Sequence, residues 1–220
     1  MKIITTALLA FLIIIEIQAQ TGTSEFQKFF KGEKEVFLSE GIPKARGLKL
    51  RMEYPKGWSN RDGKRPQVLQ FFKSAELFEM ASISVLQISK LYDGTQEELE
   101  YYSDIIADEL LSDSLMKSYI NMNEEVLIEE YEYSKTRISS LDAVFSSSKV
   151  TAQGNADIGD IRMYNQIYLL IYKDYFIIIH YMIQQHIYEN EIQFNSRINE
   201  YIPILKLMAN SIIVLNQYDY

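Results

Sequence analysis

The stretch YLLIYKDYFIIIHYMI, residues 168–183, contains the clearest structural signal in this chain of 220 residues. Nearly every position on either side of Lys173-Asp174 is apolar, and β-branched and aromatic side chains dominate. Such runs are typical of strands that are buried on both faces, inside a sheet with another layer on each side. Lys173-Asp174 predicts a tight turn. We therefore expect a central hairpin of two neighbouring antiparallel strands.

Shorter segments on the N-terminal side of this hairpin also have the pattern of strands. Residues 48–54, LKLRMEY, alternate apolar and charged side chains, which is the period of a half-buried strand, and Pro55 and Gly57 end it. Further strands are expected at residues 68–74, 82–91, 126–139, 141–152 and 161–173.

Two helices are predicted around these strands. Thr95 and Glu98 have the spacing of a capping box, and an apolar stripe at helical spacing follows at Leu99, Tyr102, Ile106 and Leu110. The second helix is expected at residues 190–210, with a kink or a restart at Pro203. Its stripe is Phe194, Ile198, Tyr201, Leu205, Met208 and Ile212. The predicted fold class is α+β, an antiparallel sheet covered on both faces by helices (an α/β/α sandwich).

The order of these elements resembles the PsbP-like superfamily, which includes the Mog-type Ran-binding proteins. The first strand ends at Tyr54-Pro55 with Trp58 at its exit, and YIPIL at residues 201–205 and Ser211-Ile212 stand near the C-terminus. The resemblance covers about residues 45–215 and implies an antiparallel sheet between helices. The best-known members of the superfamily bind protein partners without catalysis, and the tryptophan after their first strand is a packing residue. No partner-contacting residue of these members can be matched here.

Residues 1–19 predict a cleavable signal peptide. Lys2 precedes an uncharged and mostly apolar run from residue 3 to residue 15, and the small residue Ala19 suits cleavage after it. The alternative is a retained anchor. The run has 13 residues and ends at Glu16, whereas a helix needs roughly 20 to span a bilayer.

After cleavage the chain would have about 200 residues, the size of one large domain. Residues 20–45 are polar and are expected to form a flexible lead-in, and residues 46–216 to form a single PsbP-like domain. The chain has no cysteine, which excludes disulfides, thiolate metal sites and cysteine nucleophiles. The core alone must therefore supply the stability of an exported protein.

The net charge of −8 is unevenly distributed. Between residues 27 and 73 basic residues outnumber acidic ones by 12 to 5, whereas residues 93–133 hold 13 acidic residues and one lysine. An acidic chain is a poor candidate for nucleic acid, because that binding depends on neutralised phosphates. Much of the acidic run is expected to be the outer face of the first helix.

The sequence predicts no catalytic residue, no cofactor and no metal site. His180 and His186 are six positions apart, about 20 Å along one strand, which is too far for two ligands of one metal. His180 is instead expected to be a hydrogen-bonded core residue. No Gly-x-Ser-x-Gly pentapeptide occurs, which argues against a serine hydrolase. The run Ser146-Ser147-Ser148 lies in a predicted strand with alternating side chains and is interpreted as solvent-facing hydroxyls. Asp157 and Asp160 could hold a weak calcium ion, although turn formation explains them better.

A basic loop from Lys56 to Pro66 is the best candidate for a contact surface. It contains Trp58, Arg61, Lys64 and Arg65, and tryptophan and arginine are enriched among residues that dominate binding. The alternative is a solvated loop around a buried tryptophan.

These observations favour a periplasmic or secreted module that binds an unknown protein partner in the cell envelope, without chemistry and without a membrane span in its mature form. An accessory role in envelope assembly or secretion is one version of this. The alternative is a carboxylate-dependent hydrolase, for which Glu124, Glu125, Glu129 and Glu130 are the available acids.

The signal peptide leads to a direct prediction. The exported form of the protein should begin at Gln20, which intact-mass spectrometry of the exported fraction would reveal. A protein that retains Met1 and stays with the membrane would support the anchor instead.

Overall fold

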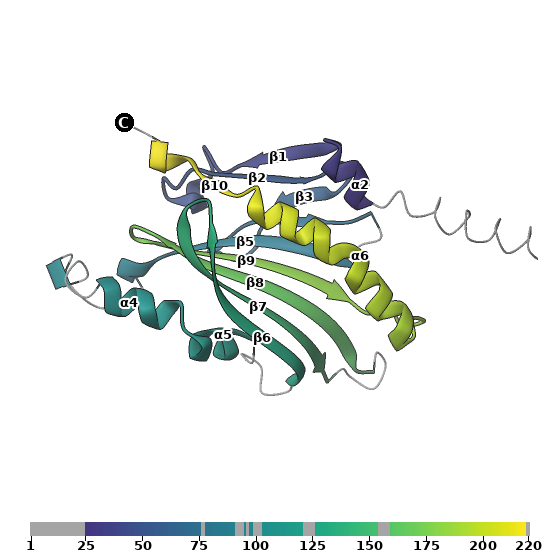
Figure 1. Cartoon of the computed structure of the whole chain (residues 1–220). Helices are drawn as coiled ribbons and strands as arrows, with labels where there is room; N and C mark the ends of the chain where they lie inside the picture. Colours follow the sequence, from purple (N-terminus) through teal and green to yellow (C-terminus); the bar gives the residue numbers. More distant parts are fainter. Residues whose placement is uncertain are drawn as a thin grey trace, which may run out of the picture.

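The computed structural model describes residues 25–75, 78–90, 95, 97–98, 103–120, 126–153 and 159–218. Most of this chain forms two antiparallel sheets (Figure 1). The larger sheet has the strand order β3 (Ser59–Asp62), β4 (Val68–Lys73), β5 (Glu79–Gln87), β9 (Tyr175–Gln184), β8 (Ile161–Tyr172), β7 (Leu141–Ala152) and β6 (Val126–Ile138). The smaller sheet contains β1 (Lys34–Leu38), β2 (Leu50–Pro55) and β10 (Ile213–Val214).

Within the described residues, four helices accompany these sheets: α2 (Glu25–Phe30), α4 (Ser103–Leu110), α5 (Asp113–Ile120) and α6 (Glu191–Asn210). Three single turns of 3₁₀-helix lie at Pro43–Ala45, Ile88–Lys90 and Leu215–Tyr218. The α+β class with antiparallel sheets is therefore confirmed. None of the helices in the described residues combines the length and the apolar character needed to cross a membrane.

The predicted hairpin is formed by β8 and β9, which pair from Met163 with Gln184 to Tyr172 with Tyr175. Alternate side chains of β9 belong to separate core clusters on the two faces of the sheet. Ile177, Ile179 and Tyr181 pack in the cluster that contains α6 and the smaller sheet. Phe176 and Ile178 pack in the cluster that contains residues of α4 and α5. The two-sided burial expected from the sequence is present.

Helix α6 crosses in front of the large sheet in Figure 1 and buries the predicted stripe from Phe194 to Met208, whereas Ile212 is buried just beyond its end. Asn190 caps it in a reciprocal arrangement with Gln193, since each side chain accepts from the backbone N–H of the other residue. The helix continues through Pro203, where a kink or a restart was expected. The buried neighbours Tyr201 and Ile204 hold both sides of the proline in place, and this packing outweighs the lost backbone hydrogen bond.

The segment predicted as a flexible lead-in differs in the structure, which describes it from residue 25 onward. It contains α2 and β1, and β1 pairs with β2 along its whole length. Phe29 and Phe37 are buried in the main core cluster. These two aromatic side chains hold an otherwise polar segment against the domain, which the local composition does not reveal.

The first predicted helix is only partly described. Thr95 and Glu98 make the capping hydrogen bonds, with Glu98 Oε2 accepting from the Thr95 N–H at 2.8 Å, whereas Leu99 and Tyr102 lie outside the described residues. Ile106 and Leu110 of α4 are buried as predicted. Helix α5 was not expected from the sequence. It begins after a break at Ser112, whose hydroxyl accepts from the Leu115 N–H at 3.1 Å.

The interpretation of Ser146-Ser147-Ser148 as solvent-facing hydroxyls was wrong. All three are buried, with Ser146 only 1% exposed and Ser148 only 2% exposed. The reason is that β7 is an inner strand, because β6 pairs with it along twelve positions and shields it. Small side chains suit this place because Tyr133 and Tyr131 stand opposite Ser146 and Ser148.

A buried ion-pair network joins the start of α6 to the sheet. Arg197 donates to both oxygens of Glu189, at 2.9 Å and 2.6 Å, to the backbone carbonyl of Gln184 at 2.6 Å, and to Glu79. The Glu79 side chain is 0% exposed and also accepts from Ser74. Burial opposes the charge on Arg197, but the hydrogen bonds that it donates to Glu189 and Glu79 outweigh this effect and raise the pKa of the guanidinium.

Replacing Arg197 should therefore destabilise the domain strongly. Arg197→Met leaves the buried carboxylate of Glu79 without a counter-charge, which costs about 3–5 kcal/mol. Arg162→Met is the matched control, because the pair between Arg162 and Glu129 is more exposed and such pairs contribute about 0–1 kcal/mol. Urea unfolding of both variants measures the two losses, and equal losses would contradict the assigned role of the network.

Candidate binding pocket

A pocket of about 720 Å³ lies between the large sheet and helices α4 and α5. It opens on the face opposite α6, and its volume is within the 300–1,000 Å³ that is usual for small-molecule sites. Most of its lining is apolar. The apolar residues are Val68, Phe71, Leu86, Leu110, Leu115, Tyr119, Leu169, Phe176 and Ile178, and the polar ones are Arg61, Lys64, Arg65, Gln67, Ser82, Ser84, Ser118 and His180.

The floor of the pocket is a row of side chains that runs across four strands. Arg61 on β3 stands opposite Phe71 on β4, Phe71 opposite Ser82 on β5, and Ser82 opposite His180 on β9. Residues that are directly opposite in neighbouring strands lie on one face of a sheet. Three inter-strand steps separate Arg61 from His180, which corresponds to about 14 Å. The row therefore has a cation at its edge and a histidine at its inner end.

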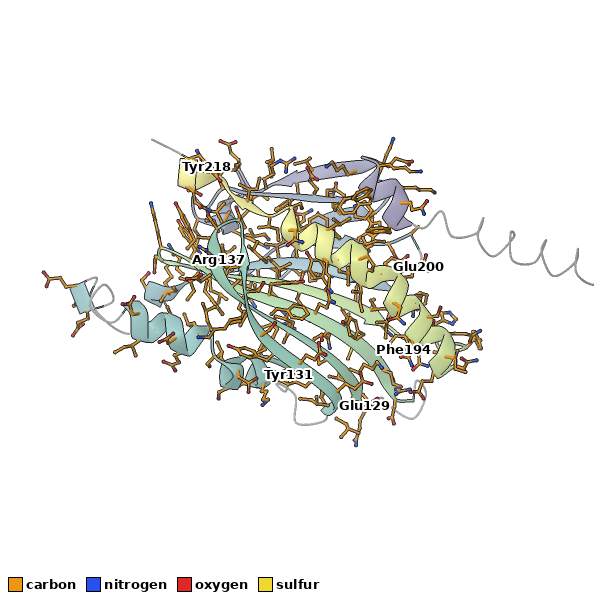
Figure 2. All side chains as sticks on the ribbon, in the orientation of Figure 1. Glu129, Tyr131, Arg137, Phe194, Glu200 and Tyr218 are labelled. Atoms are coloured by element: carbon orange, nitrogen blue, oxygen red, sulfur yellow. The ribbon has the colours of Figure 1, made fainter. Side chains whose placement is uncertain are left out.

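The roof of the pocket is attached to the sheet by two tyrosines of β6. Tyr131, labelled on β6 close to α5 in Figure 2, donates to Asp113 at 2.6 Å, and Tyr133 donates to the backbone carbonyl of Leu111 at 2.6 Å. Burial and the hydrogen bond to Asp113 raise the pKa of Tyr131. The hydrogen bond from Lys117, followed by that from Tyr131, lowers the pKa of Asp113. These bonds position α5 over the floor.

The mouth of the pocket is basic. Arg61, Lys64 and Arg65 are exposed, and the Arg61 guanidinium lies over the Phe71 ring at 5.6 Å from its centroid. Within the described part of the chain, none of the three has a carboxylate as an ion-pair partner, and no acidic residue lines the pocket. Asp62 follows Arg61 on β3 and therefore points to the other face of the sheet. The mouth thus carries an uncompensated positive charge on a chain that is acidic overall.

The backbone of the loop that carries this charge is held in place by hydrogen bonds from Lys44 and by close packing at Gly63. Lys44 donates to the backbone carbonyls of Gly63 and, at 3.3 Å, of Arg65. A Cβ at residue 63 would lie 2.2 Å from the carbonyl oxygen of Val68, so only glycine fits there. The loop is therefore a defined structure, and the cations are presented from a fixed backbone.

His180 lies at the inner end of the pocket, where Nε2 and Oδ1 of Asn165 are 2.9 Å apart. With an amide oxygen as the acceptor, Nε2 donates and Nδ1 is left as an acceptor. The ring also packs edge-to-face with Tyr119 of α5 at 6.1 Å. Burial lowers the pKa of His180 to about 4, so the imidazole is neutral at neutral pH. The predicted hydrogen bond of His180 is found, but the side chain is only partly buried and lies on a pocket wall, not in the core.

The structure brings together three of the four residues of the predicted contact surface. Arg61, Lys64 and Arg65 share the mouth of the pocket. Trp58 is separate from them, because its side chain is 4% exposed and packs against Tyr201 of α6 at a ring distance of 6.4 Å. Sequence reasoning did not associate His180, Ser82 and Ser84 with this loop, because strand pairing between distant segments brings them together.

The acidic residues considered for a hydrolase or a calcium site are either paired with cations, exposed, or outside the described residues. Glu124 and Glu125 of the hydrolase set and Asp157 of the calcium pair lie outside the described residues, and Asp160 is exposed. Glu129 pairs with Arg162 at 2.6 Å, and hydrogen bonds from Arg162 and Thr151 lower its pKa. Glu130 pairs with Lys149 at 2.8 Å beside a second pocket of about 730 Å³. The second pocket is also lined by Glu132, which accepts a hydrogen bond from Ser147 at 3.3 Å, and its one described cation, Lys149, is paired with Glu130. No group of three or more metal-binding side chains occurs among the residues that the structure describes.

Comparison with known proteins was made at the level of sequence and of structure. No protein-family model matches the chain, and no curated protein sequence matches it. The fold resembles that of PsbP and Mog1 proteins. These are the two kinds of protein that the sequence resemblance named.

Cyanobacterial PsbP (CyanoP) from Synechocystis sp. PCC 6803 is 13% identical with a TM-score of 0.48, over 81% of this chain and 92% of that chain. The Ran-binding protein Mog1p of Saccharomyces cerevisiae is 11% identical with a TM-score of 0.47, over 84% of this chain and 97% of that chain. LpqN of Mycobacterium tuberculosis, described as involved in cell envelope biogenesis, is 7% identical with a TM-score of 0.35, over 83% and 91%. The function of this chain must therefore be inferred from its own pocket and charges.

The shifted pKa of His180 predicts a pH dependence of stability. An unfolded histidine titrates near 6.5 and the folded one near 4, so between these values the unfolded state binds more protons. The contribution of His180 to the free energy of unfolding is therefore fully present above pH 6.5 and is lost as the pH falls through 4. The total loss is about 3 kcal/mol.

The variant His180→Gln cannot titrate and serves as the reference. Urea unfolding of both proteins at pH 7.5, 5.5 and 4 should show the free energy of unfolding of the wild type falling relative to the variant. Parallel pH profiles of the two proteins would contradict the assigned environment of the imidazole.

Proposed function

We propose that this chain is an exported binding module without chemistry, a single domain that acts through a protein partner in the cell envelope, with its sheet held between helices on both faces. The observation that supports this proposal most strongly is the basic mouth formed by Arg61, Lys64 and Arg65. These three exposed cations have no carboxylate partner among the described residues. Unpaired charge on a fixed loop is suited to contact another molecule.

The charge distribution favours a partner with an acidic contact surface. Most of this chain repels polyanions because its net charge is −8, so nucleic acid is disfavoured. The basic mouth is the local exception, and opposite charges across an interface orient a partner and speed its association. The predicted signal peptide supports a partner outside the cytoplasm.

A hydrolase that uses two carboxylates has less support. It needs two acids on either side of a cleft, one of which can hold a proton at working pH. Glu129 and Glu130, the described members of the predicted set, are each paired with a cation. The pKa of Glu129 is lowered by its hydrogen bond with Arg162, which makes this carboxyl unsuited to act as a general acid.

Site-specific crosslinking in cells tests the proposed partner surface. A photoreactive amino acid in place of Lys64 should produce a defined protein adduct in the exported fraction. The same substitution at Lys206, an exposed position on α6, is the control and should not produce that adduct. The adduct from position 64 should decrease about ten-fold in an Arg61→Gln/Arg65→Gln background, because two exposed charge contacts of about 0.2–1 kcal/mol each are lost. A yield that is unaffected by these changes, or an identical adduct from position 206, would overturn the proposed surface.

A further inference from the structure

The pocket behind the basic mouth has the composition of a ligand site. Phe71, Leu86, Leu169, Phe176 and Ile178 supply an apolar surface from four strands. Leu110, Leu115 and Tyr119 complete it from α4 and α5. A cavity with this lining excludes a strongly hydrated ion and favours a ligand with an apolar body.

The charge at the mouth determines what the ligand carries at its outer end. Arg61, Lys64 and Arg65 line the pocket, and none of the described residues of its lining is acidic. Arginine binds a carboxylate or a phosphate through paired hydrogen bonds. The same three charges would repel a cationic ligand and offer nothing to a neutral head group. The outer end is therefore suited to a single acid group.

The inner end of the pocket is polar as well. The hydroxyls of Ser82 and Ser84 have no hydrogen-bond partner among the described residues, and both side chains line the pocket beside His180. With Nε2 bonded to Asn165, Nδ1 of His180 is an available acceptor. A ligand that covers these groups without bonding to them would bind more weakly, because buried unpaired polar groups are costly. A hydroxyl on the ligand could satisfy both the serines and the imidazole.

We propose that this pocket binds an amphipathic organic acid, with its acid group at Arg61, Lys64 and Arg65, its apolar body between the sheet and α4–α5, and an oxygen function toward His180. The ligand uses the same three cations as the proposed partner surface, but its binding requires no partner protein. Its test on the purified protein and the crosslinking test of the proposed function can therefore fail separately.

Titration with dodecanoate below its micelle concentration tests the acid group. Isothermal titration calorimetry should give one site per chain, with dodecanol binding at least ten-fold more weakly and dodecyltrimethylammonium not binding. Dodecyl phosphate, titrated beside dodecanoate, distinguishes a phosphate head from a carboxylate head. Equal binding of dodecanol and both acids, or binding of none of them, would overturn the proposal.

The histidines provide a reporter of position, because the chain contains only His180 and His186. His186 lies outside this pocket, next to Phe78 and Tyr188. In a long-range ¹H–¹⁵N spectrum of the imidazole rings, dodecanoate should shift the signal of His180 and leave that of His186 in place. The variant His180→Gln identifies the signal. A shift of His186 alone would place the ligand elsewhere and refute the site.

Variants separate the pocket from its charged mouth. Ser118→Trp adds bulk to an exposed position of α5 that lines the pocket, and it should weaken dodecanoate binding at least ten-fold with the cations intact. Ser82→Leu adds bulk on the floor of the pocket and should weaken dodecanoate binding to a similar extent. It replaces Ser118→Trp if that variant lowers the melting temperature. Unchanged affinity in a folded variant of either kind would exclude the pocket.

The charge requirement has its own control. Arg61→Gln/Lys64→Gln/Arg65→Gln should weaken dodecanoate binding at least ten-fold and leave dodecanol binding unchanged. The control variant removes three exposed lysines elsewhere and has the same net charge. Its changes are Lys28→Gln, Lys31→Gln and Lys206→Gln. Equal losses in the two variants would show that only net charge matters.

The polar inner end is tested with 12-hydroxydodecanoate. This ligand should bind several-fold more tightly than dodecanoate to the wild-type protein. The gain should disappear in His180→Leu, which retains an apolar wall but lacks the acceptor. Weaker binding of the hydroxy acid to the wild type would overturn the proposed oxygen function.

Discussion

Burial of the β8–β9 hairpin on both faces is the constraint from which the remaining architecture follows. Ile177, Ile179 and Tyr181 face one side of the sheet and Phe176 and Ile178 the other. Each fully buried side chain of this size contributes about 1.5–3 kcal/mol, so neither face can remain in water. One face packs against α6 and the smaller sheet, whereas the other packs against residues of α4 and α5.

The two faces are completed differently, and this difference produces the pocket. On the side of α6 the core is continuous and is closed at one end by the buried pair of Arg197 and Glu79. On the other side α4 and α5 are short, and α5 is attached to β6 through Tyr131 and Tyr133. Beneath these helices the floor consists of isoleucine and phenylalanine side chains. Beyond them it is formed by the polar side chains of Ser82, Ser84 and His180. A polar floor beneath a partly open roof, with cations at the mouth, has the features of a binding site.

Several features were predictable because they depend on neighbouring residues. The alternation of apolar and charged side chains at residues 48–54 located a strand, and the stripe from Phe194 to Ile212 located α6 and its buried face. The cations of the Lys56–Pro66 loop were visible as a cluster. Others depend on distant residues and were not predictable. Ser146 and Ser148 are buried because β6 adds an outer strand beside them, and α2 and β1 are ordered because Phe29 and Phe37 reach the common core. Pro203 is tolerated because buried side chains flank it.

The α+β class, the central hairpin and the concentration of positive charge in one loop follow from the amino-acid sequence, because periodicity and composition are local properties of the chain. That His180 and Arg61 share one row of the sheet, that Trp58 lies in the core, and that the loop borders a cavity could be learned from the folded domain alone. These relations depend on the order and register in which strands pair. That order is chosen by the packing of the whole domain, since no short segment of the chain can specify it.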